Sequence, residues 1–96
     1  MTAYVIYHQT EILDPEAWAE YRSHIREGLA RFGARVIASV PDPTILEGEW
    51  GGIHNVLIEF PDRETVDRWY ASDDYKPQLA LRLKAARGNL IVLDGV

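Results

Sequence analysis

Apolar residues recur with a period of two at the start of the chain, where the segment from Ala3 to Gln9 is rich in Tyr, Val and Ile. This pattern predicts a β-strand whose even-numbered side chains lie on one face of a sheet and whose odd-numbered side chains lie on the other. The period lengthens after Asp14 and Pro15. Aspartate can accept hydrogen bonds from the free amides of a helix start, and proline fits the first helical position, so this pair predicts a helix.

The apolar residues of this helix recur every three or four positions and would form a single stripe along it. They are Trp18, Tyr21, Ile25, Leu29 and Phe32. Gly33 follows, and glycine readily adopts the left-handed backbone conformation that ends many helices. A second strand is therefore expected from Ala34 to Val40.

The connection after the second strand is longer than a tight hairpin requires, which leaves room for a short extra strand within it. It contains Trp50 in a glycine-rich stretch. The third strand, from Asn55 to Phe60, is almost continuously apolar, which predicts a central position in the sheet. Pro61 and Asp62 end this strand and begin a second helix. The inner face of that helix would carry Val66, Trp69 and Tyr70.

The end of the chain combines a last helix with a last strand. Ser72–Asp74 predicts a break, and the last helix would run from about Asp74 or Tyr75 to Arg87, with the later start favoured because Pro77 fits only the first turn. Gly88 and Asn89 would end it, and Leu90–Asp94 would form the fourth strand. The resulting order, β-α-β-β-α-β, predicts an α+β ferredoxin-like fold with a four-stranded antiparallel sheet and helices on one face.

The sequence of 96 residues has the length of one domain, spanning residues 1–96. Helices on one face leave the other apolar face of the sheet uncovered, and a second copy of the chain is the simplest cover. Three Trp, five Tyr and two Phe are also a large aromatic content for so small a core. A homodimer is therefore expected.

The net charge of −5 argues against nucleic acid as a partner, because phosphate binding requires clustered Lys and Arg. The basic residues are scattered, so a membrane surface is not expected as a partner either. There is no cysteine, which excludes disulfides, thiolate nucleophiles and cysteine metal sites. The start of the chain lacks the pattern of a signal peptide, and a cytoplasmic location is expected.

A set of landmarks distributed along almost the whole chain carries a family resemblance. They are Asp14-Pro15-Glu16, Tyr21, Gly33, Leu46-Glu47-Gly48, Ile58-Glu59-Phe60-Pro61, Trp69-Tyr70-x-Ser72-x-x-Tyr75 and Arg82. In this order they resemble the domain of unknown function 1330 family, within the dimeric α/β-barrel group of ferredoxin-like proteins. The resemblance implies a dimer with a cleft between the helices and the sheet. Proteins of this fold include cofactor-independent monooxygenases, lactone isomerases and haem-handling enzymes, so it implies no single reaction.

Arg82 is the strongest candidate for a functional residue. The helical period places it on the same face as Tyr75, Leu79, Leu83 and Ala86. An arginine beside a core stays charged and needs a carboxylate or a ligand anion. Glu47, Glu59 and Asp94 are the candidate internal partners. The alternative is that Arg82 anchors a small carboxylate ligand.

Other candidates would complete a site around Arg82. Tyr21 and Tyr75 join an apolar ring to a hydroxyl group, and they would line an aromatic pocket if they converge. His54 lies at the entrance to the third strand and is a candidate acid or base. Glu59, paired with Glu47, is a second candidate base if burial raises its pKa. No phosphate-binding glycine motif or metal-ligand set is evident, so neither a cofactor nor a metal is expected.

Two functions remain open at this point. The first is a dimeric protein that binds a small anionic or aromatic molecule, with His54 and Glu59 as catalytic candidates and Tyr21, Glu47, Tyr75 and Arg82 as ligand-binding residues. If it is an enzyme, cofactor-independent proton transfer or oxidation is the expected chemistry. The second is a non-catalytic homodimeric structural or interaction module whose aromatic residues serve only the interface.

Overall fold

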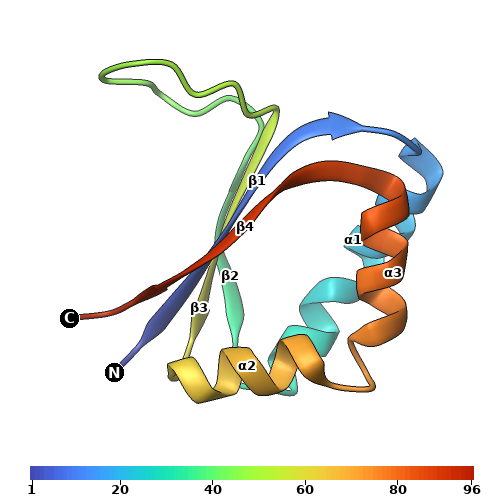
Figure 1. The fold of residues 1–96 in the computed structure, drawn as a ribbon, viewed down its shortest axis with the longest axis vertical. Coiled ribbons are helices and arrows are strands. Elements are labelled where there is room, and N and C mark those ends of the chain that lie inside the picture. The colour runs from blue at the N-terminus through green and yellow to red at the C-terminus, as the bar shows by residue number, and fades with distance from the viewer.

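The computed structural model describes residues 1–96 and contains four strands and three helices. In chain order they are β1 (Ala3–Ile12), α1 (Pro15–Ala30), β2 (Arg35–Val40), β3 (His54–Phe60), α2 (Arg63–Ala71), α3 (Lys76–Ala85) and β4 (Ala86–Asp94). The strands form one antiparallel sheet in the order β2-β3-β1-β4. The helices lie on one side of this sheet (Figure 1). This arrangement confirms the ferredoxin-like α+β fold and the central position of β3.

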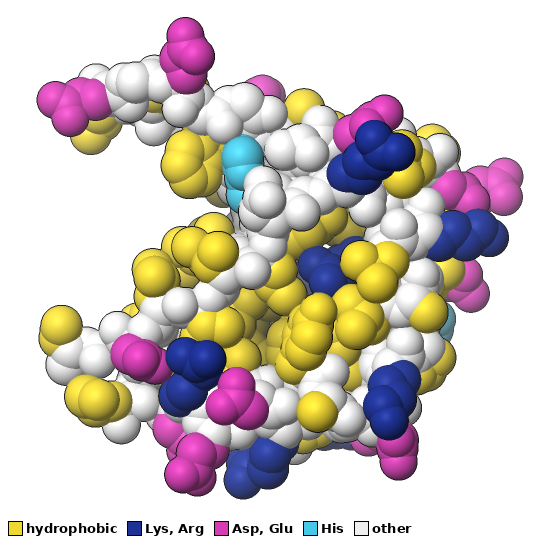
Figure 2. Space-filling view, in the orientation of Figure 1, with side chains coloured by type: hydrophobic (Ala, Val, Ile, Leu, Met, Phe, Trp, Pro, Cys, Tyr) yellow, Lys and Arg dark blue, Asp and Glu magenta, His cyan; other side chains and the backbone are white.

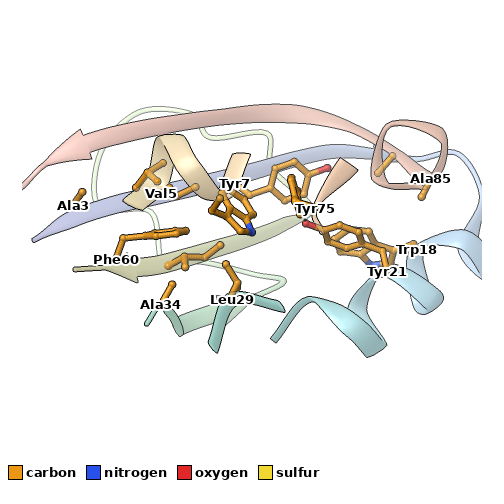
Figure 3. Close-up of a cluster of buried hydrophobic side chains, with 14 of the residues drawn as sticks. Ala3, Val5, Tyr7, Trp18, Tyr21, Leu29, Ala34, Phe60, Tyr75 and Ala85 are labelled. Carbon is orange, nitrogen blue, oxygen red and sulfur yellow. Dashed lines mark hydrogen bonds between the residues drawn. The ribbon is translucent and has the colours of Figure 1, made fainter. Parts of the chain in front are cut away.

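The two faces of β1 differ as the alternating pattern predicts. The odd-numbered residues Ala3, Val5, Tyr7 and Gln9 are buried beneath the helices. The even-numbered ones from Tyr4 to His8 are only half-buried. The buried aromatic and aliphatic side chains of the core gather between the sheet and the helices (Figure 3). We call the helix-covered side of the sheet the inner face and the opposite side the outer face.

Helix α1 begins where the sequence predicts and ends at Ala30, slightly earlier than predicted, before a turn formed by residues 31–33. The Asp14 carboxylate accepts a hydrogen bond from the amide of Ala17 at 3.2 Å, and Gly33 has a φ of +68° after the helix. The predicted apolar stripe faces the core: Trp18, Tyr21 and Leu29 are buried, and Ile25 and Phe32 pack against them.

Helix α2 confirms its predicted start but corrects its inner face. The Asp62 carboxylate accepts a hydrogen bond from the amide of Thr65 at 2.7 Å. Val66 and Trp69 are buried, whereas Tyr70 is 44% exposed. The prediction for Tyr70 was wrong because one residue turns a helix by about 100°, which moves its side chain off the stripe that Trp69 occupies.

The last helix is shorter, and the last strand longer, than the sequence predicts. Helix α3 ends at Ala85, where the amide of Ala86 bonds the carbonyl of Arg82, and β4 begins at once. Gly88 lies inside β4 opposite Gln9, so it is not a helix terminator. Leu83 is 63% exposed and does not share the inner face with Arg82. The residues after Ala85 form a strand rather than a helix because pairing with β1 satisfies the backbone N–H and C=O groups that a helix would also have satisfied.

Residues 41–53, which we call the arm, connect β2 to β3 without any strand, so no extra strand forms there. The arm projects from the sheet end on the side away from the helices, with acidic side chains near its tip (Figures 1 and 2). Its base is held to β1: the amide of Ile53 donates to the carbonyl of Gln9 at 2.8 Å, and His8 Nε2 donates to the carbonyl of Trp50 at 3.0 Å. None of the helices has the length and apolar character needed to cross a bilayer.

Candidate functional site

A cavity of about 390 Å³ lies between α1, α3 and the inner face of the sheet. Figure 2 shows apolar side chains gathered around the hollow between the sheet and the helices. All four strands and all three helices contribute to its lining, together with Tyr75 just before α3. Of the predicted site residues, Tyr21, His54, Tyr75 and Arg82 line this cavity.

Arg82 has no carboxylate partner. It is 5% exposed, and it takes part in none of the ion pairs of the chain. Its guanidinium carbon lies 5.0 Å from the centre of the Tyr7 ring, close enough for a cation–π interaction. Its Nε is buried without a hydrogen-bond partner. The Tyr7 ring and the hydroxyl groups of Tyr7 and Tyr75 therefore compensate the buried charge only in part.

The cavity concentrates positive charge in a protein of net charge −5. Arg22, Arg26 and Arg82 line it, and no Asp or Glu does. Six of the ten Lys and Arg residues of the chain form ion pairs, and these three are not among them. The fourth without an ion pair, Arg68, lies outside the cavity and donates to the Thr65 hydroxyl. The unpaired arginines are thus gathered at one place.

Two buried tyrosines meet beside Arg82. The hydroxyl groups of Tyr21 and Tyr75 are hydrogen-bonded at 2.9 Å (Figure 3). Burial raises the pKa of both phenols, and the positive charge of Arg82 only partly offsets this effect. Trp18 stacks on Tyr21 with ring centres 5.6 Å apart. Both hydroxyls therefore stay protonated near neutral pH and can act as hydrogen-bond donors.

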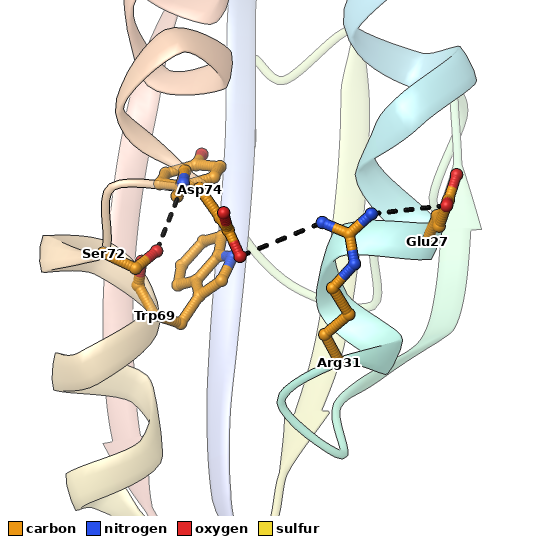
Figure 4. A network of polar contacts seen from close by, with 6 residues as sticks. Glu27, Arg31, Trp69, Ser72 and Asp74 are labelled. Atoms are coloured by element: carbon orange, nitrogen blue, oxygen red, sulfur yellow. Dashed lines mark hydrogen bonds and ion pairs between the residues drawn. The ribbon is translucent and has the colours of Figure 1, made fainter.

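Local backbone geometry brings Tyr75 to the cavity. The Ser72 hydroxyl donates to the carbonyl of Trp69 at 2.7 Å and accepts from the amide of Tyr75 at 3.1 Å. This turn is anchored to α1 through Arg31, which contacts Asp74 at 3.9 Å and Glu27 at 3.3 Å (Figure 4). The serine of the Trp69-Tyr70-x-Ser72-x-x-Tyr75 landmark thus holds the backbone at Tyr75, whose ring packs against Trp69 with ring centres 4.1 Å apart.

His54 lines the cavity from the start of β3. Its Nε2 lies 3.0 Å from the hydroxyl of Ser39, and its ring meets the edge of Trp18 at 6.0 Å. Burial lowers the pKa of His54, and the charge of Arg22 lowers it further. The imidazole is therefore neutral near pH 7 and retains a lone pair that can accept a proton.

The two glutamates predicted for the site lie elsewhere. Glu59 is opposite Tyr4 on the outer face, where its carboxylate binds Arg35 Nε at 3.2 Å. Glu47 is exposed in the arm. The position of Glu59 follows from the alternation of side chains between the two faces of β3, because Glu59 follows Ile58, whose side chain faces the cavity. Neither glutamate can serve Arg82 as a partner or the cavity as a base within one chain.

Sequence reasoning missed several residues of the cavity. Tyr7, Arg22, Arg26 and Ser39 line it but were not singled out. A signal existed for the two arginines, since positions 18, 22, 25 and 26 share one side of a helix with a period of 3.6 residues. Their exposure at the rim of the cavity made them resemble ordinary surface residues.

Gln9 is an unusual core residue. It is fully buried on the inner face of β1, and neither its amide nitrogen nor its oxygen has a hydrogen-bond partner. An unpaired buried amide costs roughly 1–3 kcal/mol. The substitution Gln9→Met keeps the shape and removes this cost, so we expect the free energy of unfolding to rise by about 1–2 kcal/mol. Urea unfolding measures the change, and Gln9→Glu should shift the midpoint the other way. A destabilised Gln9→Met protein would contradict the account.

The fold can be compared with solved structures. The chain is similar to a protein of unknown function from Rhodopseudomonas palustris, with a TM-score of 0.75 and 18% identity, covering 99% of this chain and 82% of that chain. It is similar to a dimeric ferredoxin-like protein of unknown function from Jannaschia sp. CCS1, with a TM-score of 0.73 and 11% identity, covering 100% of this chain and 99% of that chain. The chain is also similar to SnoaB, a cofactor-independent oxygenase from Streptomyces nogalater, with a TM-score of 0.72 and 8% identity, covering 99% of this chain and 93% of that chain.

At these low identities the likeness establishes the fold alone. No curated protein matches the sequence. The family model of the Domain of unknown function (DUF1330) matches residues 2–96, which is almost the whole chain. This chain belongs to the DUF1330 family.

Proposed function

We propose that the protein binds a small aromatic or apolar anion in the cavity, with Arg82 as the anchor of the anionic group. The observation that carries this proposal is a buried arginine that lines a cavity and has no carboxylate partner. Burying an unpaired charge is costly, and a ligand anion would offset that cost with charge-assisted hydrogen bonds. The unbonded Nε of Arg82 is consistent with this role.

The rest of the cavity matches such a ligand. A volume of about 390 Å³ is within the range of small-molecule sites. Eleven of its seventeen lining residues are hydrophobic, and several of these are aromatic. Arg22 and Arg26 lie exposed at the rim, where they would attract anions from solution. This combination favours ligand binding over a purely structural module, which would need no cavity of this size.

Replacing Arg82 with methionine tests the anchor. We expect Arg82→Met to weaken the binding of benzoate by about 10- to 100-fold, because a charge-assisted hydrogen bond contributes roughly 1.5–3 kcal/mol. Binding of neutral benzyl alcohol should change little. Chemical-shift titration measures both affinities.

Arg68→Met is the matched control, since Arg68 is also free of ion pairs but lies outside the cavity. It should leave both affinities unchanged. If Arg82→Met is more stable than the parent and binds benzoate equally well, the guanidinium is only a tolerated structural charge and the anchor is disproved.

We also propose that two copies pair through the outer face of the sheet. Ile6 lies there on β1, between Leu57 of β3 and Ile91 of β4. Ile91 and Leu93 remain about half exposed in the single chain, which is a large apolar area for a sheet surface in water. The dimeric ferredoxin-like relative from Jannaschia supports this arrangement.

A cofactor-independent enzyme is the finer form of the proposal. The similarity to SnoaB, a cofactor-independent oxygenase, supports the idea that this fold can act on a substrate with its side chains alone. Among the candidate bases, His54 is the one that lines the cavity.

A further inference from the structure

The most buried end of the cavity offers hydrogen-bond donors that the chain leaves unused. Tyr21 and Tyr75 share a single hydrogen bond, so one hydroxyl donates and the other keeps a proton without an acceptor. Arg82 cannot accept this proton, because a guanidinium group has only donors. No carboxylate lines the cavity. A phenol proton and the unpartnered Nε–H of Arg82 are therefore both available to an oxygen atom of a ligand.

This group of donors suits an oxygen that becomes negatively charged. Tyrosines whose pKa is raised by burial remain protonated beside an anion and stabilise it by donating a hydrogen bond. Arg82 adds a fixed positive charge beside Tyr21 and Tyr75, and all three side chains are buried. The arrangement has the properties of an oxyanion site, in which donors lie in place before the charge develops.

A base, His54, also lies beside the Trp18 ring. Trp18 stacks on Tyr21 and meets His54 edge-on, so the indole joins the two parts of the cavity. If Nε2–H of His54 donates to the hydroxyl of Ser39, the Nδ1 lone pair has no hydrogen-bond partner in the chain. Ser39 would then act as a positioning residue that fixes the tautomer in which Nδ1 is the base.

We infer that the cavity catalyses keto–enol proton transfer in an aromatic carbonyl compound that also carries a carboxylate. His54 removes a proton from the carbon next to the carbonyl, and the electrons of that C–H bond shift to form the enolate. The enolate oxygen is held by the Tyr21–Tyr75 pair and Arg82. Protonation of the enolate oxygen gives the enol, and return of a proton to the carbon restores the keto form with exchange of hydrogen, so no oxidant or other co-reactant is consumed. The inference rests on the anion-binding function proposed above, in which Arg82 holds an anionic oxygen: the carboxylate of a simple ligand such as benzoate, or the enolate oxygen of a keto acid whose carboxylate lies at the rim.

The substrate class follows from the positions of the charges. The inner donors meet the carbonyl oxygen, whose charge develops during the reaction. Arg22 and Arg26 at the rim suit a permanent carboxylate that remains partly in water. Val36, Val56 and Ile58 offer an apolar wall for an aromatic ring. An aryl-substituted keto acid has these three parts: a carbonyl group, a carboxylate and an aromatic ring.

Phenylpyruvate is a suitable probe, because its benzylic protons exchange with deuterium through the enol. We expect the protein to accelerate this exchange above the buffer rate in an NMR time course. His54→Gln should reduce the acceleration by about 100-fold or more, as expected for loss of a general base. Tyr75→Phe should reduce it by about 10- to 100-fold, as expected for loss of one oxyanion donor. His54→Gln should bind phenylpyruvate within about threefold of the parent, because His54 acts in the proton transfer rather than in holding the carbonyl oxygen.

Two further measurements keep the inference open to disproof. Added imidazole should partly restore exchange in a His54→Ala variant, which a structural role of His54 would not produce. Arg68→Met should exchange at the parental rate. Phenylpyruvate that binds but exchanges no faster than in buffer overturns the proton-transfer inference and leaves ligand binding standing, and full activity in His54→Gln also overturns it. If neither phenylpyruvate nor benzoate binds, the proposed function itself fails.

Discussion

Replacing Ile91 with lysine is expected to separate the proposed homodimer into monomers. Ile91 is 49% exposed in the single chain and lies opposite Ile6 in the middle of the outer face. In a two-fold dimer the substitution would bury an unpaired ammonium twice. Each uncompensated buried charge costs on the order of 3–5 kcal/mol, so the dissociation constant should rise by about a thousandfold or more. Sedimentation velocity over a concentration series measures it.

The control for this variant is Leu83→Lys. Leu83 is also a large exposed aliphatic residue, at 63%, but it lies on α3, on the opposite side of the sheet from the proposed interface. It should leave the oligomeric state unchanged. Both variants should keep the circular dichroism spectrum of the parent, since both positions are accessible to water in one chain. If Ile91→Lys sediments as the parent dimer, the outer face is not the interface.

The fold was predictable where local chemistry and hydrophobic period agree. Asp14 with Pro15 sets one helix start, Gly33 marks the end of that helix, and the alternation in β1 identifies its buried face. The prediction failed at the α3–β4 junction. Residues 86–89 carry no strong strand signal of their own, and their pairing with β1 over a long sequence separation determines their structure. Local patterns cannot report a tertiary contact that overrides them.

The site was predictable only in part for a related reason. Tyr21, Tyr75 and Arg82 were found because a large or charged group on an apolar helix face is conspicuous in a sequence. Glu59 was misplaced because a strand position one residue away faces the opposite side of the sheet. The absence of a carboxylate near Arg82 is a three-dimensional fact that excludes an ion pair within one chain, and the sequence could not show it.

A methyl group added at Gly88 is expected to destabilise the protein strongly. A Cβ at this position would lie 2.5 Å from the carbonyl oxygen of His8 and 3.0 Å from both Gln9 Cα and the Tyr7 ring. The first two atoms belong to the β1 backbone and cannot move without disturbing its pairing with β4. Forced overpacking costs about 1–3 kcal/mol. At roughly 4–8 °C per kcal/mol for a domain of this size, the Tm of Gly88→Ala should fall by about 10 °C or more.

The same substitution at Gly28 should stabilise the protein instead, so the two variants together test the account. Gly28 lies within α1, and a Cβ there meets no atom within 4 Å. Alanine favours a helix over glycine by about 0.5–1 kcal/mol, so Gly28→Ala should raise the Tm by a few degrees. Calorimetry of both variants measures the difference. A Gly88→Ala protein as stable as the parent would mean that β4 does not approach β1 as described.

Because Tyr7 lies both beside Gly88 and beneath Arg82, a shift of its ring should also weaken benzoate binding in Gly88→Ala but not in Gly28→Ala.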